Sequence, residues 1–141
     1  MADAALRTKR VLIVDDEPTV LAVLEEFFKN FRHDHAYEVQ TASNGTDAYR
    51  TFLRARPDLV LLDMNMPGMD GLQLLKEIRA LDARVPIMMV TANEKTQAAA
   101  DAHTAGVSAY VPKPFDFRHL DMLVSLVLSS PRGPAGSAAT R

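Results

Sequence analysis

The sequence contains no cysteine, and it also lacks several other patterns that would point to particular classes of protein. Without cysteine the fold cannot depend on disulfides, and thiol chemistry is excluded. No apolar run is long enough to span a bilayer, and residues 1–10 lack the apolar centre of a secretory signal. The formal net charge is only -2. The sequence also lacks a cluster of lysine and arginine of the kind that contacts nucleic acid. We therefore expect a cytoplasmic protein that binds neither a membrane nor nucleic acid directly.

Length and composition predict one domain with short flanking segments. The 141 residues, of which 48% are hydrophobic, fit a single compact unit that can bury its own core. We expect a polar lead over residues 1–8 and the folded domain over residues 9–129. Residues 130–141 are mostly Ser, Pro, Gly and Ala, which bury too little apolar surface to order a chain. This end is either a disordered tail or the start of a linker to an output domain.

Five short apolar segments, each followed by a helical pattern, predict the fold class. The expected strands are residues 11–15, 37–42, 59–63, 86–91 and 108–111, and Pro18 and Pro57 mark a helix start and a helix stop. Strands and helices that alternate at this spacing form a parallel sheet covered on both faces. We therefore predict an α/β protein with a flavodoxin-like, doubly wound, five-stranded parallel sheet flanked by five helices.

Polar residues stand where the expected strands end, and ligands of such folds bind at that edge. Taken alone, Asp15 and Asp16 are ordinary helix-capping acids, Asp63 an ordinary turn residue, and Thr91 and Lys113 common strand and surface residues. Together they gather three carboxylates that repel one another unless a cation is bound, and all the donors are hard oxygens. This pattern predicts Mg²⁺. With a hydroxyl and an ammonium at the same edge, it also predicts phosphoryl transfer.

Four segments resemble the signature segments of the receiver domain of two-component response regulators: VLIVDDE, LVLLDMNMPGMDG, PIMMVTA and GVSAYVPKPF. The resemblance runs from about residue 10 to residue 129. It implies that Asp63 is the phosphoacceptor. It further implies that Asp15, Asp16, Asp63 and the backbone carbonyl of Asn65 bind Mg²⁺. The phosphoryl donor would be a sensor histidine kinase, so the chain would be a phosphoacceptor switch in a phosphorelay and not an enzyme with an external substrate.

The resemblance also assigns roles beyond the acid cluster. Lys113 and Thr91 would contact the phosphoryl group, and Thr91 with Tyr110 would form the switch that follows phosphorylation. The Lys113–Pro114 peptide bond would be cis. The switch would move the face formed by the fourth helix, the fifth strand and the fifth helix, and this face would bind a downstream protein, an output domain or a second copy of the chain.

The last helical segment offers a candidate partner surface. Leu120 and Val124 belong to its expected core stripe, while Met122 and Leu126 lie on nearly the opposite side at i, i+4 spacing. Two outward apolar residues indicate a contact surface, although scattered surface apolar residues without a function are equally common.

Two other classes of protein are alternatives to this interpretation of the acid pattern. A phosphatase of the haloacid dehalogenase type needs a second aspartate two residues after the nucleophile, and Asn65 stands there instead. A nucleotide- or flavin-binding module needs a glycine-rich phosphate loop after the first strand, where Asp15 and Asp16 stand. Both readings are disfavoured. A receiver that is never phosphorylated is disfavoured as well, because every expected site residue is present.

Overall fold

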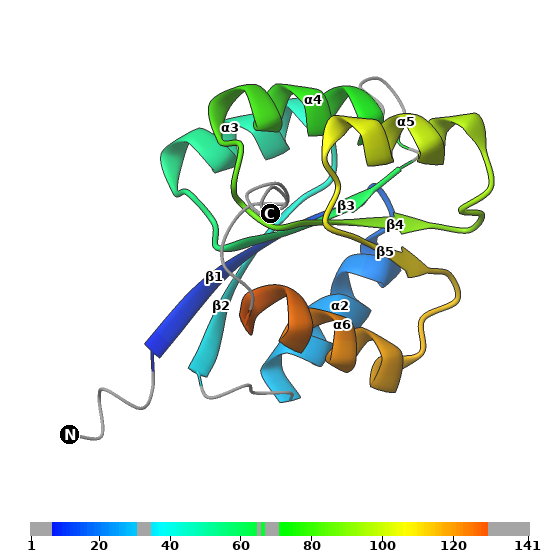
Figure 1. Cartoon of the computed structure of the whole chain (residues 1–141). Helices are drawn as coiled ribbons and strands as arrows, with labels where there is room; N and C mark the ends of the chain where they lie inside the picture. Colours follow the sequence, from blue (N-terminus) through cyan, green and yellow to red (C-terminus); the bar gives the residue numbers. More distant parts are fainter. Residues whose placement is uncertain (1–6, 31–34, 65, 67–70, 130–141) are drawn as a thin grey trace.

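The computed structural model describes residues 7–30, 35–64, 66 and 71–129 (Figure 1). In this part of the chain strands and helices alternate throughout. In chain order they are β1 (Arg7–Val14), α2 (Pro18–Asn30), β2 (His35–Ala42), α3 (Gly45–Arg54), β3 (Leu59–Asp63), α4 (Gly71–Leu81), β4 (Ile87–Thr91), α5 (Gln97–Ala105), β5 (Ala109–Pro112) and α6 (Phe117–Ser129). None of the described helices has the length and apolar character needed to cross a membrane.

The strands form one parallel sheet in the order β2-β1-β3-β4-β5. Helices α3, α4 and α5 cover one face of the sheet, and α2 and α6 cover the other (Figure 1). The predicted doubly wound sheet is therefore confirmed. Strand β2 lies on one side of β1, and β3, β4 and β5 follow on the other side, so the strand order reverses at β1. Sheets of this kind bind ligands at the carboxyl ends of the strands where the order reverses.

Each face of the sheet has its own hydrophobic core, because alternate residues of a strand point to opposite faces. Leu62 and Phe52 belong to the core under α3, α4 and α5. Leu61 and Phe27 belong to the core under α2 and α6. All five residues of β3 are buried, as expected for a central strand covered on both sides.

Strand β1 begins at Arg7, four residues before the start that the apolar run predicts. Its first four residues are polar and carry no hydrophobic signal, yet they pair in register with β2 from Arg7↔His35 to Arg10↔Glu38. Asp58 bonds to the backbone of Arg10 at the end of this polar stretch. Its carboxylate accepts from the Arg10 N–H (2.8 Å), and its own N–H donates to the Arg10 carbonyl (2.7 Å). Backbone pairing, not apolar burial, therefore sets this strand end.

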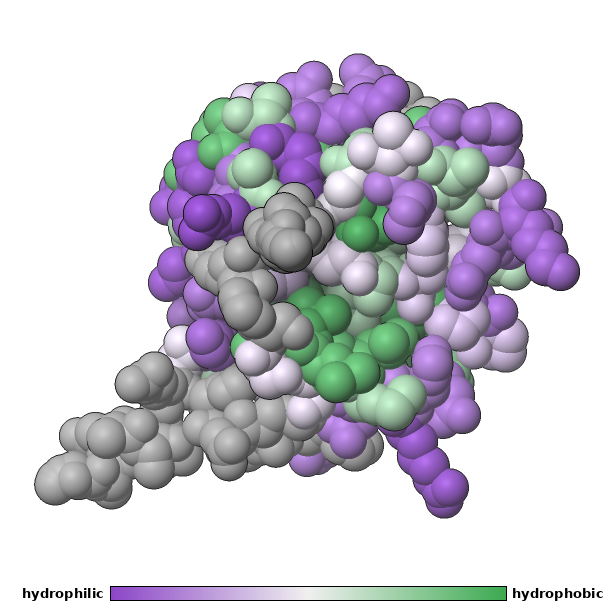
Figure 2. Space-filling model, viewed as in Figure 1, coloured by the Kyte–Doolittle hydropathy of each residue, from purple (hydrophilic) through white to green (hydrophobic). Residues whose placement is uncertain are grey.

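Helix α6 buries one side and exposes apolar residues on the other. Leu120 and Val124 are fully buried, whereas Met122 and Leu126 are 51% and 56% exposed. The space-filling view shows a hydrophobic area on the face where α6 lies near β5 (Figure 2). The predicted division of this helix into a core side and an outward apolar side is confirmed.

Candidate functional site

Parallel pairing brings three aspartates to one edge of the sheet. Asp15 follows the last residue of β1, and its N–H donates to the Ala42 carbonyl at the end of β2 (3.1 Å). Asp63 is the last residue of β3, which lies beside β1. Since the two strands run in the same direction, their carboxyl ends meet at the same edge. Asp16 completes the group, and each of the three carboxylates has an oxygen within 4.8 Å of the others.

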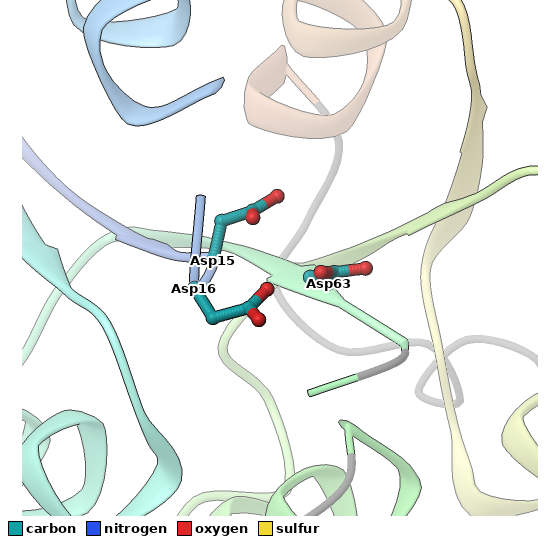
Figure 3. Close-up of side chains that lie close together, drawn as sticks. All are labelled: Asp15, Asp16 and Asp63. Atoms are coloured by element: carbon teal, nitrogen blue, oxygen red, sulfur yellow. The ribbon is translucent and has the colours of Figure 1, made fainter. Parts of the chain in front are cut away.

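The three acids differ in their exposure to solvent. Asp15 is 1% exposed and Asp63 is 4% exposed, whereas Asp16 is exposed. Figure 3 shows the side chains of Asp15 and Asp16 extending from the end of β1 toward the region beside Asp63. The cluster is thus a buried pair of acids with a third, solvated acid at its rim.

Burial raises the pKa of the Asp15 carboxyl from 3.8 to about 6, because the charged form loses its hydration. The nearby Asp63 and Asp16 carboxylates push this pKa further up. The Glu17 N–H, which donates to Asp15 Oδ1 (2.9 Å), and the Lys113 ammonium hold the pKa down. The folded chain therefore holds the ionised form of Asp15 at a cost in stability.

Lys113 brings a positive charge into the same cluster from the end of β5. Its Nζ lies 3.6 Å from Asp63 Oδ1 and 3.9 Å from Asp15 Oδ2. The Lys113 N–H donates to the Thr91 carbonyl (3.0 Å), which ties this residue to the end of β4. The Lys113–Pro114 bond is cis, as the resemblance implies. The ammonium lies where it can contact any group that binds to Asp63.

The donor set fits a hard divalent cation. Asp15 Oδ2 is buried and receives no hydrogen bond from the described residues, so its interaction there is the long ion pair with Lys113. A buried carboxylate oxygen without a donor is costly, and a bound cation removes that cost. Clustered carboxylate oxygens are ligands that Mg²⁺ prefers. Asn65, whose carbonyl was expected to add a ligand, lies outside the described residues.

An open hollow of about 300 Å³ lies beside the cluster. Its lining consists of Asp16, Glu17, Asp63, Ala92 and Lys113. Negative and positive side chains thus meet in one depression that is open to solvent. A small anion that entered it would reach Asp63 and Lys113 together.

Of the two predicted switch residues, Thr91 ends β4 at this edge and Tyr110 lies within β5, and the two have separate hydrogen-bond partners. Thr91 is buried, and its hydroxyl donates to the Asn93 carbonyl (3.2 Å) and accepts from the Asn93 N–H (3.1 Å). The Tyr110 hydroxyl donates to the Ala99 carbonyl in α5. Burial, and next the negative charge of Glu94, raise the pKa of Tyr110, so the hydroxyl keeps its proton as a donor.

Two residues near the site were missed in the sequence. Gly71 opens α4, and a Cβ there would lie 2.3 Å from the Asp63 carbonyl oxygen, so only glycine permits this close approach. The signal available was a glycine at the start of a helical pattern next to the Asp63 loop. Glu17 lines the hollow and supplies the N–H to Asp15, but a backbone donor has no side-chain signature.

The chain resembles known proteins of one family along most of its length. Residues 11–125 match the response regulator receiver domain family. The chain is 39% identical over 119 residues to the regulatory protein AtoC of Escherichia coli (strain K12), a match that covers 84% of the chain and 25% of AtoC. It is 33% identical over 111 residues to sporulation initiation phosphotransferase F of Bacillus subtilis (strain 168), covering 79% of the chain and 86% of that protein.

A solved structure gives the same similarity. The receiver domain of the sensor histidine kinase PA1611 from Pseudomonas aeruginosa PAO1, described with a magnesium ion coordinated in its active site cleft, superposes with a TM-score of 0.78 at 30% identity. The match covers 87% of the chain and 99% of that domain. The chain spans only 25% of AtoC and 52% of the PrrA regulator of Mycobacterium leprae.

Proposed function

The chain belongs to the receiver domains of two-component response regulators, which act in phosphorelay signalling, and we propose that its phosphoacceptor is Asp63. The observation that carries the proposal is the placement of Asp63. It is nearly buried, lines the hollow, has two acids beside it and lies 3.6 Å from the Lys113 ammonium. We propose a sensor histidine kinase as the donor and residues 9–129 as the complete receiver unit.

In the proposed reaction an Asp63 carboxylate oxygen attacks phosphorus. A P–O bond forms while the bond between phosphorus and the imidazole nitrogen of a phosphohistidine breaks, and that nitrogen leaves with the bonding electrons. Lys113 stabilises the negative charge on the phosphoryl oxygens, and the strand ends hold the reacting groups in place. A water molecule later attacks the acyl phosphate, which releases inorganic phosphate and restores Asp63.

Asp15, Asp16 and Asp63 are the described residues that would hold Mg²⁺. Bound there, the ion would offset the charge of the carboxylates and of the phosphoryl oxygens. The bond from the Glu17 N–H orients the Asp15 carboxylate, and the other oxygen of this carboxylate, which lacks a donor among the described residues, would provide one ligand position. The backbone carbonyl of Asn65 stays a predicted further ligand.

Phosphorylation would change the surface that partners contact. The Thr91 hydroxyl would exchange its bonds with Asn93 for a phosphoryl oxygen, and Tyr110 would leave the Ala99 carbonyl and turn inward. Both changes alter the area around α5, β5 and α6. The exposed Met122 and Leu126 make this area the proposed contact surface for a downstream protein, an output domain or a second copy.

The test is mass spectrometry of the chain after treatment with acetyl phosphate, with and without Mg²⁺. We expect one added phosphoryl group on the wild type when Mg²⁺ is present, and none on Asp63→Asn. Glu77→Gln, on the exposed side of α4, is the matched control that loses a carboxylate elsewhere and should react like the wild type. An adduct that forms without metal, or that persists in Asp63→Asn, would refute the assignment.

A turnover assay separates this proposal from a phosphatase. A receiver reacts about once with an acyl phosphate, and its own aspartyl phosphate then hydrolyses slowly. A phosphatase, by contrast, hydrolyses small phosphomonoesters repeatedly. The proposed role is therefore a switch that catalyses its own phosphorylation and dephosphorylation. A cytoplasmic location stays a prediction from the sequence.

A further inference from the structure

Arg79, in the last turn of α4, bonds through its side chain to three backbone carbonyls away from the acid site. Its Nε and Nη2 donate to the Gly106 carbonyl (3.0 and 2.8 Å), and its Nη1 donates to the carbonyls of Val85 (2.6 Å) and Asp82 (3.2 Å). One guanidinium thus joins the end of α4, the segment before β4 and the end of α5. A planar, permanently charged fork suits this arrangement, and a lysine cannot reproduce it.

Gly106 is shaped for this contact. It ends α5 in the left-handed conformation, with a φ of 103°, and a Cβ on it would lie 3.1 Å from Arg79 Nε. The turn is closed by bonds from the Gly106 N–H to the His103 carbonyl and from the Val107 N–H to the Ala102 carbonyl, each 3.1 Å long. Glycine at position 106 therefore permits the left-handed turn that ends α5, and it also leaves space for the Arg79 side chain.

The other end of α5 is held more weakly. Residues 92–97 are exposed, and the helix buries only Ala99 and Ala102, two small side chains. The Tyr110 hydroxyl bond to the Ala99 carbonyl ties this half to β5, and the proposed switch would break that bond. The four bonds of Arg79 given above, by contrast, all go to backbone carbonyls of Gly106, Asp82 and Val85.

We propose that Arg79 clamps the C-terminal end of α5, so that phosphorylation swings the N-terminal end of this helix about a fixed Gly106. The swing rests on the proposed phosphorylation of Asp63, while the clamp exists in the resting protein. Few contacts have to break for the N-terminal end of α5 to move. The C-terminal end keeps its position, because Arg79 holds Gly106. The signal thus reaches partners as a tilt of α5 and not as its release from the domain.

Amide hydrogen exchange, measured by NMR on the full chain, tests the clamp. The Val107 N–H reports the clamped end, and the Ala100 N–H, bonded to the Thr96 carbonyl (3.1 Å), reports the free end. In Arg79→Met we expect exchange at Val107 to accelerate tenfold or more, with less than a threefold change at Ala100. The exchange rate at Val107 in Arg79→Lys should lie between those of the wild type and Arg79→Met. The Lys variant also keeps the test usable if the Met variant unfolds. Lys76→Met, which removes an exposed cation from the same helix, should change neither amide.

The swing is tested by repeating the measurement with acetyl phosphate and Mg²⁺, while the adduct is counted by mass spectrometry in the same samples. In the phosphorylated wild type, exchange should change at Ala100 by threefold or more and stay the same at Val107. In phosphorylated Arg79→Lys it should change at both amides. Equal changes at both amides of the wild type would overturn the swing, and an unaltered Val107 in both Arg79 variants would overturn the clamp. Absence of an adduct on the wild type would overturn the proposed function and the swing with it, while the resting-state comparison would still decide the clamp.

Discussion

Replacing Asp15 by asparagine should stabilise the metal-free protein while removing its function. The pKa of Asp15 rises from 3.8 to about 6 on folding, mainly through burial. The difference between these two values corresponds to about 3 kcal/mol, at about 1.4 kcal/mol for each tenfold change in proton affinity. Asparagine has nearly the same shape, carries no charge and can still accept the Glu17 N–H through its amide oxygen. The variant therefore keeps the local bond and loses the buried charge.

The sign of the effect follows from proton binding. As the pH rises from 3.8 to about 6, the unfolded chain has lost the Asp15 proton while the folded chain still holds it. The free energy of unfolding of the wild type therefore falls across this window and stays low at higher pH. Asp15→Asn should exceed the wild type by about 3 kcal/mol at pH 7.5 but by only about 1 kcal/mol at pH 4.5.

Urea unfolding in EDTA, followed by far-ultraviolet circular dichroism, measures this difference. Asp16→Asn is the matched control, since this acid is exposed, and its effect should stay below about 1 kcal/mol at both pH values. Added Mg²⁺ should raise the unfolding free energy of the wild type and leave Asp15→Asn nearly unchanged. A gain that is equal at the two pH values, or a loss at pH 7.5, would show that the buried charge of Asp15 is not the cause.

Three further predictions concern the reaction, the packing at the site and the partner surface. Lys113→Ala should slow formation of the Asp63 adduct about 100-fold or more, measured by mass spectrometry over time, because it removes the cation 3.6 Å from Asp63; a rate within threefold of the wild type would remove Lys113 from the mechanism. Gly71→Ala should lower the unfolding free energy in urea by about 1 to 3 kcal/mol, since the new Cβ would meet the Asp63 carbonyl at 2.3 Å; unchanged stability would show that α4 shifts freely there. Met122→Glu with Leu126→Glu should abolish any phosphorylation-dependent self-association in sedimentation while leaving the adduct intact; unchanged association would place the contact elsewhere.

The fold could be predicted wherever burial dictated residue type. The span of β3 was predicted to the residue, because a strand covered on both faces must be apolar throughout. The start of β1 was not predicted, because Arg7 to Arg10 are held by backbone pairing with β2 and by Asp58, and backbone bonds leave no trace in hydropathy.

The convergence of the acids could be predicted for a different reason. Asp15, Asp63 and Lys113 end or follow parallel strands, and the ends of such strands share an edge whatever their loops do. Contacts that depend on the docking of a helix were out of reach. The approach of Gly71 to Asp63 requires the placement of α4, and the bond from Tyr110 to Ala99 requires that of α5.

The sheet separates two cores, and this separation bears on how such a domain can diversify. Helix α5 packs in the core that it shares with α3 and α4, while Leu120 and Val124 of α6 pack in the core on the reverse side. Side chains in one layer do not interdigitate with those in the other, because the strands lie between them. Substitutions on the outward side of α6 can therefore accumulate without disturbing the packing of α5 on the opposite layer, so that the two surfaces are free to evolve at separate rates.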